Sequence, residues 1–183
     1  MIVPLYRQVN CGHDAAVEVA IEGAMDSSPS NDFVVRALTA ADLLPLRQLN
    51  ALFGVAFHEP ETYGSQPPGD GYIRALLADA QTIVVVALAR GEVAGGLVAY
   101  ELRKFERERS EIYLYDLAVA ESFRRRGIAS ALLERLSAIA VERGASSVFV
   151  QADTIDEPAI ALYGKFGVRE EVLHFDIRPV RLT

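Results

Sequence analysis

The stretch Arg124-Arg125-Arg126-Gly127-Ile128-Ala129 is the most informative part of the sequence for the fold, because it places three arginines at the start of a predicted helix. It joins a predicted strand, Glu111 to Val119, to a predicted helix, Gly127 to Arg143. A helix N-terminus carries about half a positive charge, so acidic side chains rather than three arginines are expected there. Free backbone N–H groups, a glycine and flanking arginines together form a cradle for a phosphate. The pattern therefore predicts an anion-binding loop between a strand and a helix.

The composition predicts one globular domain in the cytoplasm. Of the 183 residues, 51% are hydrophobic and 23% are charged, which is an ordinary balance for a chain with a sizeable core. No apolar run approaches the roughly 20 residues of a membrane span. The N-terminus also lacks the basic and apolar segments of a secretory signal, so we expect no membrane partner.

Charge and metal-ligating residues narrow the class of function. The net charge of −7 argues against general nucleic-acid binding, which needs a basic face, and is compatible with a cationic substrate. The single cysteine, Cys11, excludes an internal disulfide framework and a Cys-rich metal site. The histidines are scattered along the chain as His13, His58 and His174. We expect neither a nucleic-acid partner nor a metal.

The order of predicted elements, β-α-α-β-β-β-α-β-α-β, indicates a mixed sheet with helices packed on it. We assign residues 1–31 to an N-terminal extension that is partly disordered, residues 32–177 to one domain and residues 178–183 to a tail. The predicted strands are Phe33 to Leu38, Thr82 to Ala89, Val93 to Leu102, Glu111 to Val119, Ser147 to Ala152 and Val168 to Ile177. The predicted helices are Thr39 to Phe57, Gly71 to Asp79, Gly127 to Arg143 and Glu157 to Phe166. His58 to Gly71 is predicted to be a loop, and Gly95-Gly96 a bulge or a close backbone approach.

The motif Arg124-x-x-Gly127-x-Ala129 resembles the (Gln/Arg)-x-x-Gly-x-(Gly/Ala) signature of the GNAT N-acetyltransferases. The similarity extends over the strand before it and the run Ala-Leu-Tyr-x-Lys-x-Gly at 161–167, and it covers roughly Asp32 to Asp176. It implies an α/β (α+β) GNAT fold, in which helices flank a mixed, mostly antiparallel central sheet. It also implies that acetyl-CoA is the acetyl donor.

Three segments narrow the resemblance: Glu111–Val119, Val150–Asp153 and Arg169–Ile177 look like those of the GNAT-type aminoglycoside 3-N-acetyltransferases, which acetylate gentamicin-like antibiotics. This implies direct transfer of an acetyl group to the 3-amino group of a cationic aminoglycoside, and thereby antibiotic resistance. Relatives of this fold are frequently dimers, so a homodimer is expected on the same ground. Residues 1–31 depart from the pattern.

The resemblance assigns one group of residues to acetyl-CoA. Backbone N–H groups of roughly Arg125 to Ser130 would cradle the pyrophosphate, and Gly127 lets the main chain come close. In the family, N–H groups of the preceding strand bind the acetyl carbonyl, and Leu117 and Val119 would supply them. The alternative for the loop is a solvated basic surface. The predicted cofactor-binding residues are Leu117, Ala118, Val119, Arg124, Arg125, Arg126, Gly127, Ile128, Ala129 and Ser130.

Asp116 is the predicted general base, because a protonated amine must lose a proton before it can react. Aspartate is disfavoured in a strand interior, yet this one lies in a run of tyrosine and leucine. Strict alternation along the strand would point its side chain in the same direction as Ile112 and Leu114. The alternative is an aspartate at a strand end that is satisfied by local hydrogen bonds.

Tyr163 matches a family position that often donates a proton to the departing CoA thiolate, and the alternative is a tyrosine packed on the core. Acidic residues in the last third of the chain would hold a polycationic sugar through charge-assisted hydrogen bonds. The resemblance favours Asp153, Glu157 and Asp176 for this role, with Tyr115 as a weaker substrate-binding candidate. For each acid, a solvated surface charge is the alternative.

Two other functions remain open on the sequence. One is a GNAT enzyme for another amine, such as a polyamine or a protein lysine. The other is a non-catalytic acyl-CoA-binding module, against which the presence of Asp116 and Tyr163 argues.

Overall fold

The computed structural model describes residues 32–179, so the predicted N-terminal extension lies outside the described residues. These residues contain a five-stranded sheet in the order β1-β2-β3-β4-β5. Neighbouring strands are antiparallel except β4 and β5, which are parallel. The strands are β1 (Val34–Ala37), β2 (Thr82–Ala89), β3 (Glu92–Arg103), β4 (Ser110–Val119) and β5 (Val148–Val150). The prediction of a mixed, mostly antiparallel sheet is confirmed.

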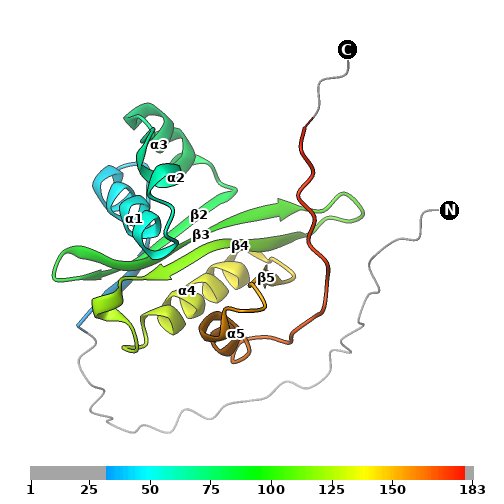
Figure 1. Ribbon diagram of the computed structural model, residues 1–183. Coiled ribbons are helices and arrows are strands. Elements are labelled where there is room, and N and C mark those ends of the chain that lie inside the picture. The colour runs from blue at the N-terminus through cyan, green and yellow to red at the C-terminus, as the bar shows by residue number, and fades with distance from the viewer. Residues whose placement is uncertain (1–31, 180–183) are drawn as a thin grey trace, which may run out of the picture. The chain divides into compact units, whose positions relative to one another are not determined.

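Helices cover both faces of this sheet (Figure 1). One face carries α1 (Leu43–Ala56), α2 (Pro60–Gly64) and α3 (Asp70–Ala78), and the opposite face carries α4 (Ile128–Arg143) and α5 (Glu157–Tyr163). A short 3-10 turn, η1 (Glu121–Phe123), precedes α4. The sheet is therefore the middle layer between two apolar clusters, one under α1 and α3 and the other under α4.

The sequence of β2 shows why both faces are covered. Ile83, Val85 and Ala87 belong to the cluster under α4, whereas Val84 and Val86 belong to the cluster under α1 and α3. A strand that is buried on both faces carries apolar residues at every position rather than at alternate ones. The apolar run TIVVVALA forms a strand over the predicted residues, and the structure places it inside the sheet, between β1 and β3.

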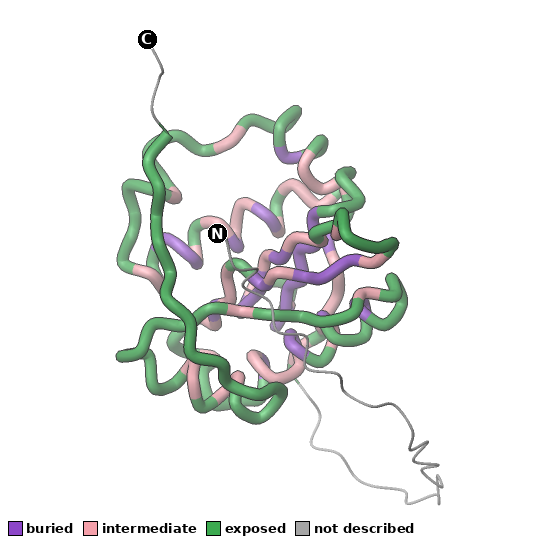
Figure 2. The backbone as a smooth tube through the Cα atoms, turned by 90° about the vertical axis from the view of Figure 1, so that its right-hand side faces the viewer, coloured by how far each residue is buried: buried purple, intermediate pink, exposed green. Residues whose placement is uncertain are grey.

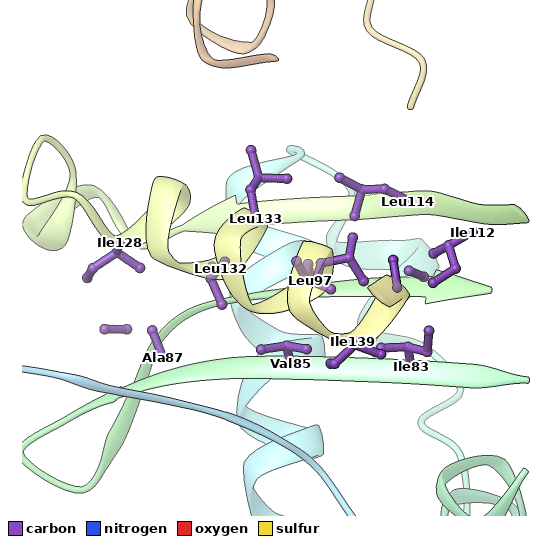
Figure 3. Packing of buried hydrophobic residues seen from close by; sticks show 14 of the residues in the cluster. Ile83, Val85, Ala87, Leu97, Ile112, Leu114, Ile128, Leu132, Leu133 and Ile139 are labelled. Atoms are coloured by element: carbon purple, nitrogen blue, oxygen red, sulfur yellow. The ribbon is translucent and has the colours of Figure 1, made fainter. Parts of the chain in front are cut away.

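Helix α4 is seated on the sheet by apolar residues at helical spacing. Ile128, Leu132 and Leu136 are each at most 2% exposed, and they belong to the apolar cluster between α4 and the sheet. Figure 3 shows Ile128 and Leu132 of α4 in this cluster beside residues of β2 and β3. The helix starts after Gly127 and ends before Gly144, and both glycines are left-handed. The buried face fixes the helix, and with it the position of its N-terminus at the end of β4.

Gly96 lets α1 approach the sheet closely. A Cβ atom there would lie 2.6 Å from Leu49 Cδ1 and 2.8 Å from the carbonyl oxygen of Val85. The β2–β3 register also shifts between Ala87 and Leu88, and Ala87 lies opposite Gly95. Of the two alternatives predicted for this glycine pair, the close approach is present at Gly96, and the bulge lies next to the pair, at Ala94.

Two expectations about secondary structure are wrong. The predicted strand Val168 to Ile177 is not formed, and this run is exposed throughout (Figure 2). A strand needs a neighbour along its length, and β5 is only three residues long. The predicted loop His58 to Gly71 contains α2, which begins at Pro60 and is too short for its periodicity to show in the sequence.

Candidate active site

An extra residue in β4 sets the direction of the side chains that follow it. Val98 pairs with Asp116 and Ala99 pairs with Leu114, so Tyr115 has no partner of its own on β3. This is a β-bulge, which reverses the side-chain alternation of a strand. Leu114 packs under α4 (Figure 3), whereas Asp116 lines a pocket beneath α1 and α2. The prediction that Asp116 points with Ile112 and Leu114 is therefore wrong.

The same bulge turns two backbone N–H groups away from β3. The N–H of Ala120 donates to the carbonyl of Ala94 at 2.9 Å, so by antiparallel alternation the N–H of Ala118 also faces β3. The N–H groups of Leu117 and Val119 then face the opposite side. The pairing of β4 with β5 ends at Leu114 and Val150, so within residues 32–179 no strand lies along that side of Leu117 and Val119.

The N-terminus of α4 lies just beyond this open edge and has free donors. Gly127 has φ +81°, no side chain caps the helix, and its first turn contains no acidic residue. The N–H of Ala131 makes the first backbone bond of the helix, to the carbonyl of Gly127 at 3.0 Å. The N–H groups of residues 128–130 therefore have no intrahelical partner, an arrangement that suits an anion.

The three arginines before α4 have different surroundings, although all are exposed. Arg124 donates through Nε to the carbonyl of Val119 at 3.3 Å, which ties the loop to the end of β4. The guanidinium of Arg126 lies 5.2 Å from the centre of the Phe123 ring. Arg125 has φ +63°, a left-handed conformation that is uncommon for a residue with a side chain. The loop therefore carries positive charge around the free N–H groups.

Asp116 is half-buried, and its surroundings favour the protonated form. Burial raises the pKa of Asp116 and Glu59 raises it further, while a hydrogen bond from Tyr63 lowers it. The Tyr63 hydroxyl lies 3.5 Å from Oδ2 of Asp116. Burial, together with Asp116, raises the pKa of Tyr63 to about 12, so this phenol is protonated and acts as the donor. A carboxylate with a raised pKa binds a proton more readily than an ordinary aspartate, as a general base must.

Tyr163 is the last residue of α5, which lies on the opposite face of the sheet from α1 and α2. Burial raises its pKa to about 12, with further contributions from Asp156 and Asp116. The side chain packs against the cluster under α4, in line with the alternative of a core tyrosine. A phenol with this pKa keeps its proton at neutral pH, so Tyr163 can donate a hydrogen bond or a proton.

The carboxylates of Glu59, Asp116 and Asp153 line one cavity, which we call the acidic pocket. Its volume is about 680 Å³, and its lining residues are Asn50, Phe57, Glu59, Thr62, Tyr63, Tyr115, Asp116 and Asp153. None of the described residues in this lining is basic. The pocket therefore attracts a cation and offers it several acceptors for charge-assisted hydrogen bonds.

The structure brings together some of the predicted substrate-binding residues and not others. Tyr115 and Asp153 line the acidic pocket with Asp116. Glu157 lies exposed in the first turn of α5, outside this lining. Asp176 lies on the exposed C-terminal run, where its Oδ1 lies 3.2 Å from Nε2 of His174. Sequence reasoning missed Glu59 and Tyr63, because both lie in the segment predicted to be a loop.

Comparison with known proteins decides the family. Residues 46–168 match the profile of the acetyltransferase (GNAT) family. The chain belongs to the acetyltransferase (GNAT) family. GNAT enzymes use acetyl-CoA as the acetyl donor, and the free donors at the start of α4 are the feature of this chain that suits the phosphates of such a donor.

Solved structures and a curated relative are similar to most of the chain. An aminoglycoside acetyltransferase from an uncultured soil metagenomic sample is 54% identical, with a TM-score of 0.79 over 81% of this chain and 99% of that one. A second one from such a sample, in complex with sisomicin, is 31% identical, with a TM-score of 0.74 over 81% of this chain and 97% of that one. Streptothricin acetyltransferase from Streptomyces lavendulae is 28% identical over 148 residues, which are 81% of this chain and 74% of the relative.

No helix between residues 32 and 179 is long and apolar enough to cross a bilayer. In the same part of the chain, no three His, Cys, Asp or Glu side chains are grouped in a way that could hold a metal ion.

Because its pKa is raised, ionised Asp116 should lower the stability of the folded protein at neutral pH. The folded chain binds a proton at Asp116 more tightly than the unfolded chain, so ionisation costs stability as the pH rises above the ordinary aspartate pKa. Asp116→Asn removes this cost, and we expect it to raise the Tm at pH 7. The difference in Tm between the wild type and the variant should vanish at a pH below about 3.9, where Asp116 is protonated in both the folded and the unfolded chain.

Asp42→Asn is the matched control with the opposite sign. The Arg36 guanidinium, 2.7 Å from Asp42, holds the pKa of that carboxyl well below its ordinary value. The stability that Asp42 contributes is therefore present at pH 7 and is lost as the pH falls, so this variant should lower the Tm. Thermal melts of both variants from pH 3 to pH 8 measure the two trends. A lower Tm for Asp116→Asn at pH 7 would contradict the description of Asp116.

Proposed function

We propose that this chain transfers an acetyl group from acetyl-CoA directly to the 3-amino group of aminoglycosides of the gentamicin type, and thereby confers resistance to them. One observation carries the proposal: the carboxylates of Glu59, Asp116 and Asp153 line one pocket without a basic neighbour in that lining. An aminoglycoside is a polycation, and each of its ammonium groups needs an acceptor when it leaves water. The choice of the 3-amino group rests on the resemblance of 111–119, 150–153 and 169–177.

On the donor side, the chain offers backbone N–H groups and arginines. The N–H groups of residues 128–130 would bind the pyrophosphate, with Gly127 at the closest approach and Arg124 to Arg126 around it. The N–H groups of Leu117 and Val119, which face the open edge of β4, would donate to the acetyl carbonyl oxygen. When bound there, acetyl-CoA supplies an acetyl group that is activated as a thioester.

On the acceptor side, Asp116 would take a proton from the substrate ammonium and leave a neutral amine. Its raised pKa suits it to this step better than an ordinary aspartate. Glu59, Asp153 and Tyr115 would hold the rest of the cation in the acidic pocket. Tyr163 keeps its proton at neutral pH and would give it to the sulfur that leaves.

The named activities of similar proteins support the proposed substrate class. Two solved structures similar to most of this chain are aminoglycoside acetyltransferases, one of them in complex with sisomicin. The curated relative acetylates streptothricin, according to its name. We also propose that the protein is cytoplasmic, on the basis of its composition. On the basis of the family resemblance, we propose that it forms a homodimer.

A panel of amines tests the proposed reaction. Release of CoA, followed with a thiol reagent, should be strong with gentamicin or sisomicin and weak with spermidine and a lysine peptide. Asp116→Asn should lower kcat/KM by about 10²–10⁴-fold, the usual contribution of a positioned base. Asp79→Asn, an exposed aspartate outside the acidic pocket, is the matched control and should leave turnover unchanged.

The other outcomes of this panel distinguish the alternatives. Turnover only with spermidine or the peptide would keep the family and reject the substrate class. Binding of acetyl-CoA without turnover of any amine would favour the non-catalytic module. Full activity of Asp116→Asn on a good substrate would reject Asp116 as the base.

The proposed phosphate cradle can be tested with a matched pair of glycines. Gly127 and Gly144 flank the two ends of α4, both have positive φ, and a Cβ atom at either would meet nothing within 4 Å. Alanine at either position should therefore cost a similar backbone strain, about 1–2 kcal/mol. Only Gly127→Ala should raise the KM for acetyl-CoA, by about tenfold, the equivalent of one lost charge-assisted hydrogen bond.

Steady-state kinetics and urea unfolding of both variants separate the two effects. An equal change of KM in Gly127→Ala and Gly144→Ala would show that strain alone is responsible. It would contradict a phosphate site at the start of α4.

A further inference from the structure

A second cavity lies beside Asp116, on the same face of the sheet as the acidic pocket. Its volume is about 520 Å³, and it lies among α1, α2, α3 and the middle of β3. We call it the apolar pocket, and its main walls are Leu49, Phe53, Tyr72, Ile73, Val98 and Tyr100. This volume is within the range of about 300–1,000 Å³ for small-molecule sites.

The two pockets meet at a polar boundary. Asn50, Tyr63 and Asp116 line both of them. An ammonium group bound at Asp116 could therefore carry a substituent that extends in either direction. The nature of each pocket then selects which substituent enters it.

The apolar pocket and the acidic pocket differ in the charge of their linings. The charged residues among the described lining of the apolar pocket are Asp116 and Arg47, and Arg47 is paired with Asp70 at 2.6 Å. The uncompensated charge is thus a single carboxylate at one end, whereas the acidic pocket has three. A second ammonium group would lose its water in the apolar pocket without gaining a carboxylate, which is costly. The apolar pocket therefore suits a molecule with one positive charge and an uncharged body.

Aromatic side chains strengthen this preference. Tyr63, Tyr72 and Tyr100 face the apolar pocket, and their rings offer flat apolar surfaces. Burial, followed by the charge of Asp116, raises the pKa of Tyr100, so its hydroxyl is neutral at physiological pH. These walls suit a hydrocarbon chain or an aromatic ring.

The apolar pocket can be reached from solvent past an apolar rim. Val55 is 77% exposed and Tyr72 is 65% exposed, and both belong to its lining. Ala51, an exposed residue of α1, lies on the same rim. Large apolar side chains exposed around a cavity are typical of a ligand-binding site.

We propose that the apolar pocket is a second acceptor compartment, which receives the hydrocarbon or aromatic substituent of a primary monoamine whose ammonium lies at Asp116. This rests on the proposed acetyl transfer at Asp116 and extends the acceptor class from polycationic sugars to amphipathic monoamines. The amine gives one proton to Asp116, its nitrogen bonds to the acetyl carbon, and the carbon–sulfur bond breaks. The second proton lost on amide formation leaves with the sulfur as CoA thiol.

A series of n-alkylamines tests the proposal, because their charge and basicity are constant while their length grows. In the wild type, kcat/KM for butylamine, hexylamine and octylamine should rise by about fourfold per added methylene group until the pocket is full. Ala51→Trp, which places a large ring at the rim, should bring the ratio of octylamine to butylamine close to one. Ala138→Trp, at an exposed alanine of α4 outside both pockets, is the matched control and should keep the wild-type ratio.

Direct binding separates failure of this proposal from failure of the proposed function. Calorimetric titration of octylamine without acetyl-CoA should show binding that Ala51→Trp weakens and Ala138→Trp does not. If sisomicin is acetylated but octylamine neither binds nor reacts better than butylamine, the apolar compartment is overturned and the aminoglycoside activity stands. If no amine is acetylated and octylamine does not bind, both are overturned. If octylamine binds without reacting, the pocket binds amphipathic amines but is not an acceptor compartment, so the proposal is again overturned.

Discussion

The unpaired residue Tyr115 shifts the pairing of β4 by one position from Asp116 onward. Without this bulge, Asp116 would share the face of Ile112 and Leu114 and would enter the apolar cluster under α4. An ionised carboxylate is strongly disfavoured in such a place. With the bulge, the carboxylate lies where the acidic and apolar pockets meet, half-buried and close to Tyr63. The direction of one side chain thus depends on one extra residue in the ladder.

The same shift places opposite chemistry on two sides of β4. At the edge of β4 that extends past the end of β5, the N–H groups of Leu117 and Val119 pair with no strand among the described residues. The free N–H donors and the arginines at the start of α4 follow on this side. Beneath α1 and α2, the carboxylates of the acidic pocket form a region of negative charge. A polyanionic donor and a cationic acceptor can therefore approach the end of the strand from different sides. The overall charge of −7 does not reveal this separation.

Local sequence signals predicted the loop at 124–129 and helix α4, because a helix end and its glycines depend on neighbouring residues alone. Asp116 could be singled out because a charged residue in an apolar strand conflicts with its surroundings. Its direction could not be predicted, since a bulge is defined by pairing with a strand distant in sequence. Glu59 and Tyr63 were missed because α2 has only five residues. The apolar spacing of 168–177 resembled a strand, but strand formation also requires a neighbouring edge of sufficient length.

Amide hydrogen exchange of the ligand-free protein, followed by NMR, tests most directly whether the bulge redirects the backbone of β4. The geometry predicts rapid exchange for Leu117 and Val119, whose N–H groups face the open edge, and slow exchange for Ala118 and Ala120, whose N–H groups face β3. Addition of acetyl-CoA should then slow the exchange of Leu117 and Val119. Equally slow exchange of all four amides before addition would mean that β4 is paired on both sides beyond Leu114, and it would contradict this account of the site.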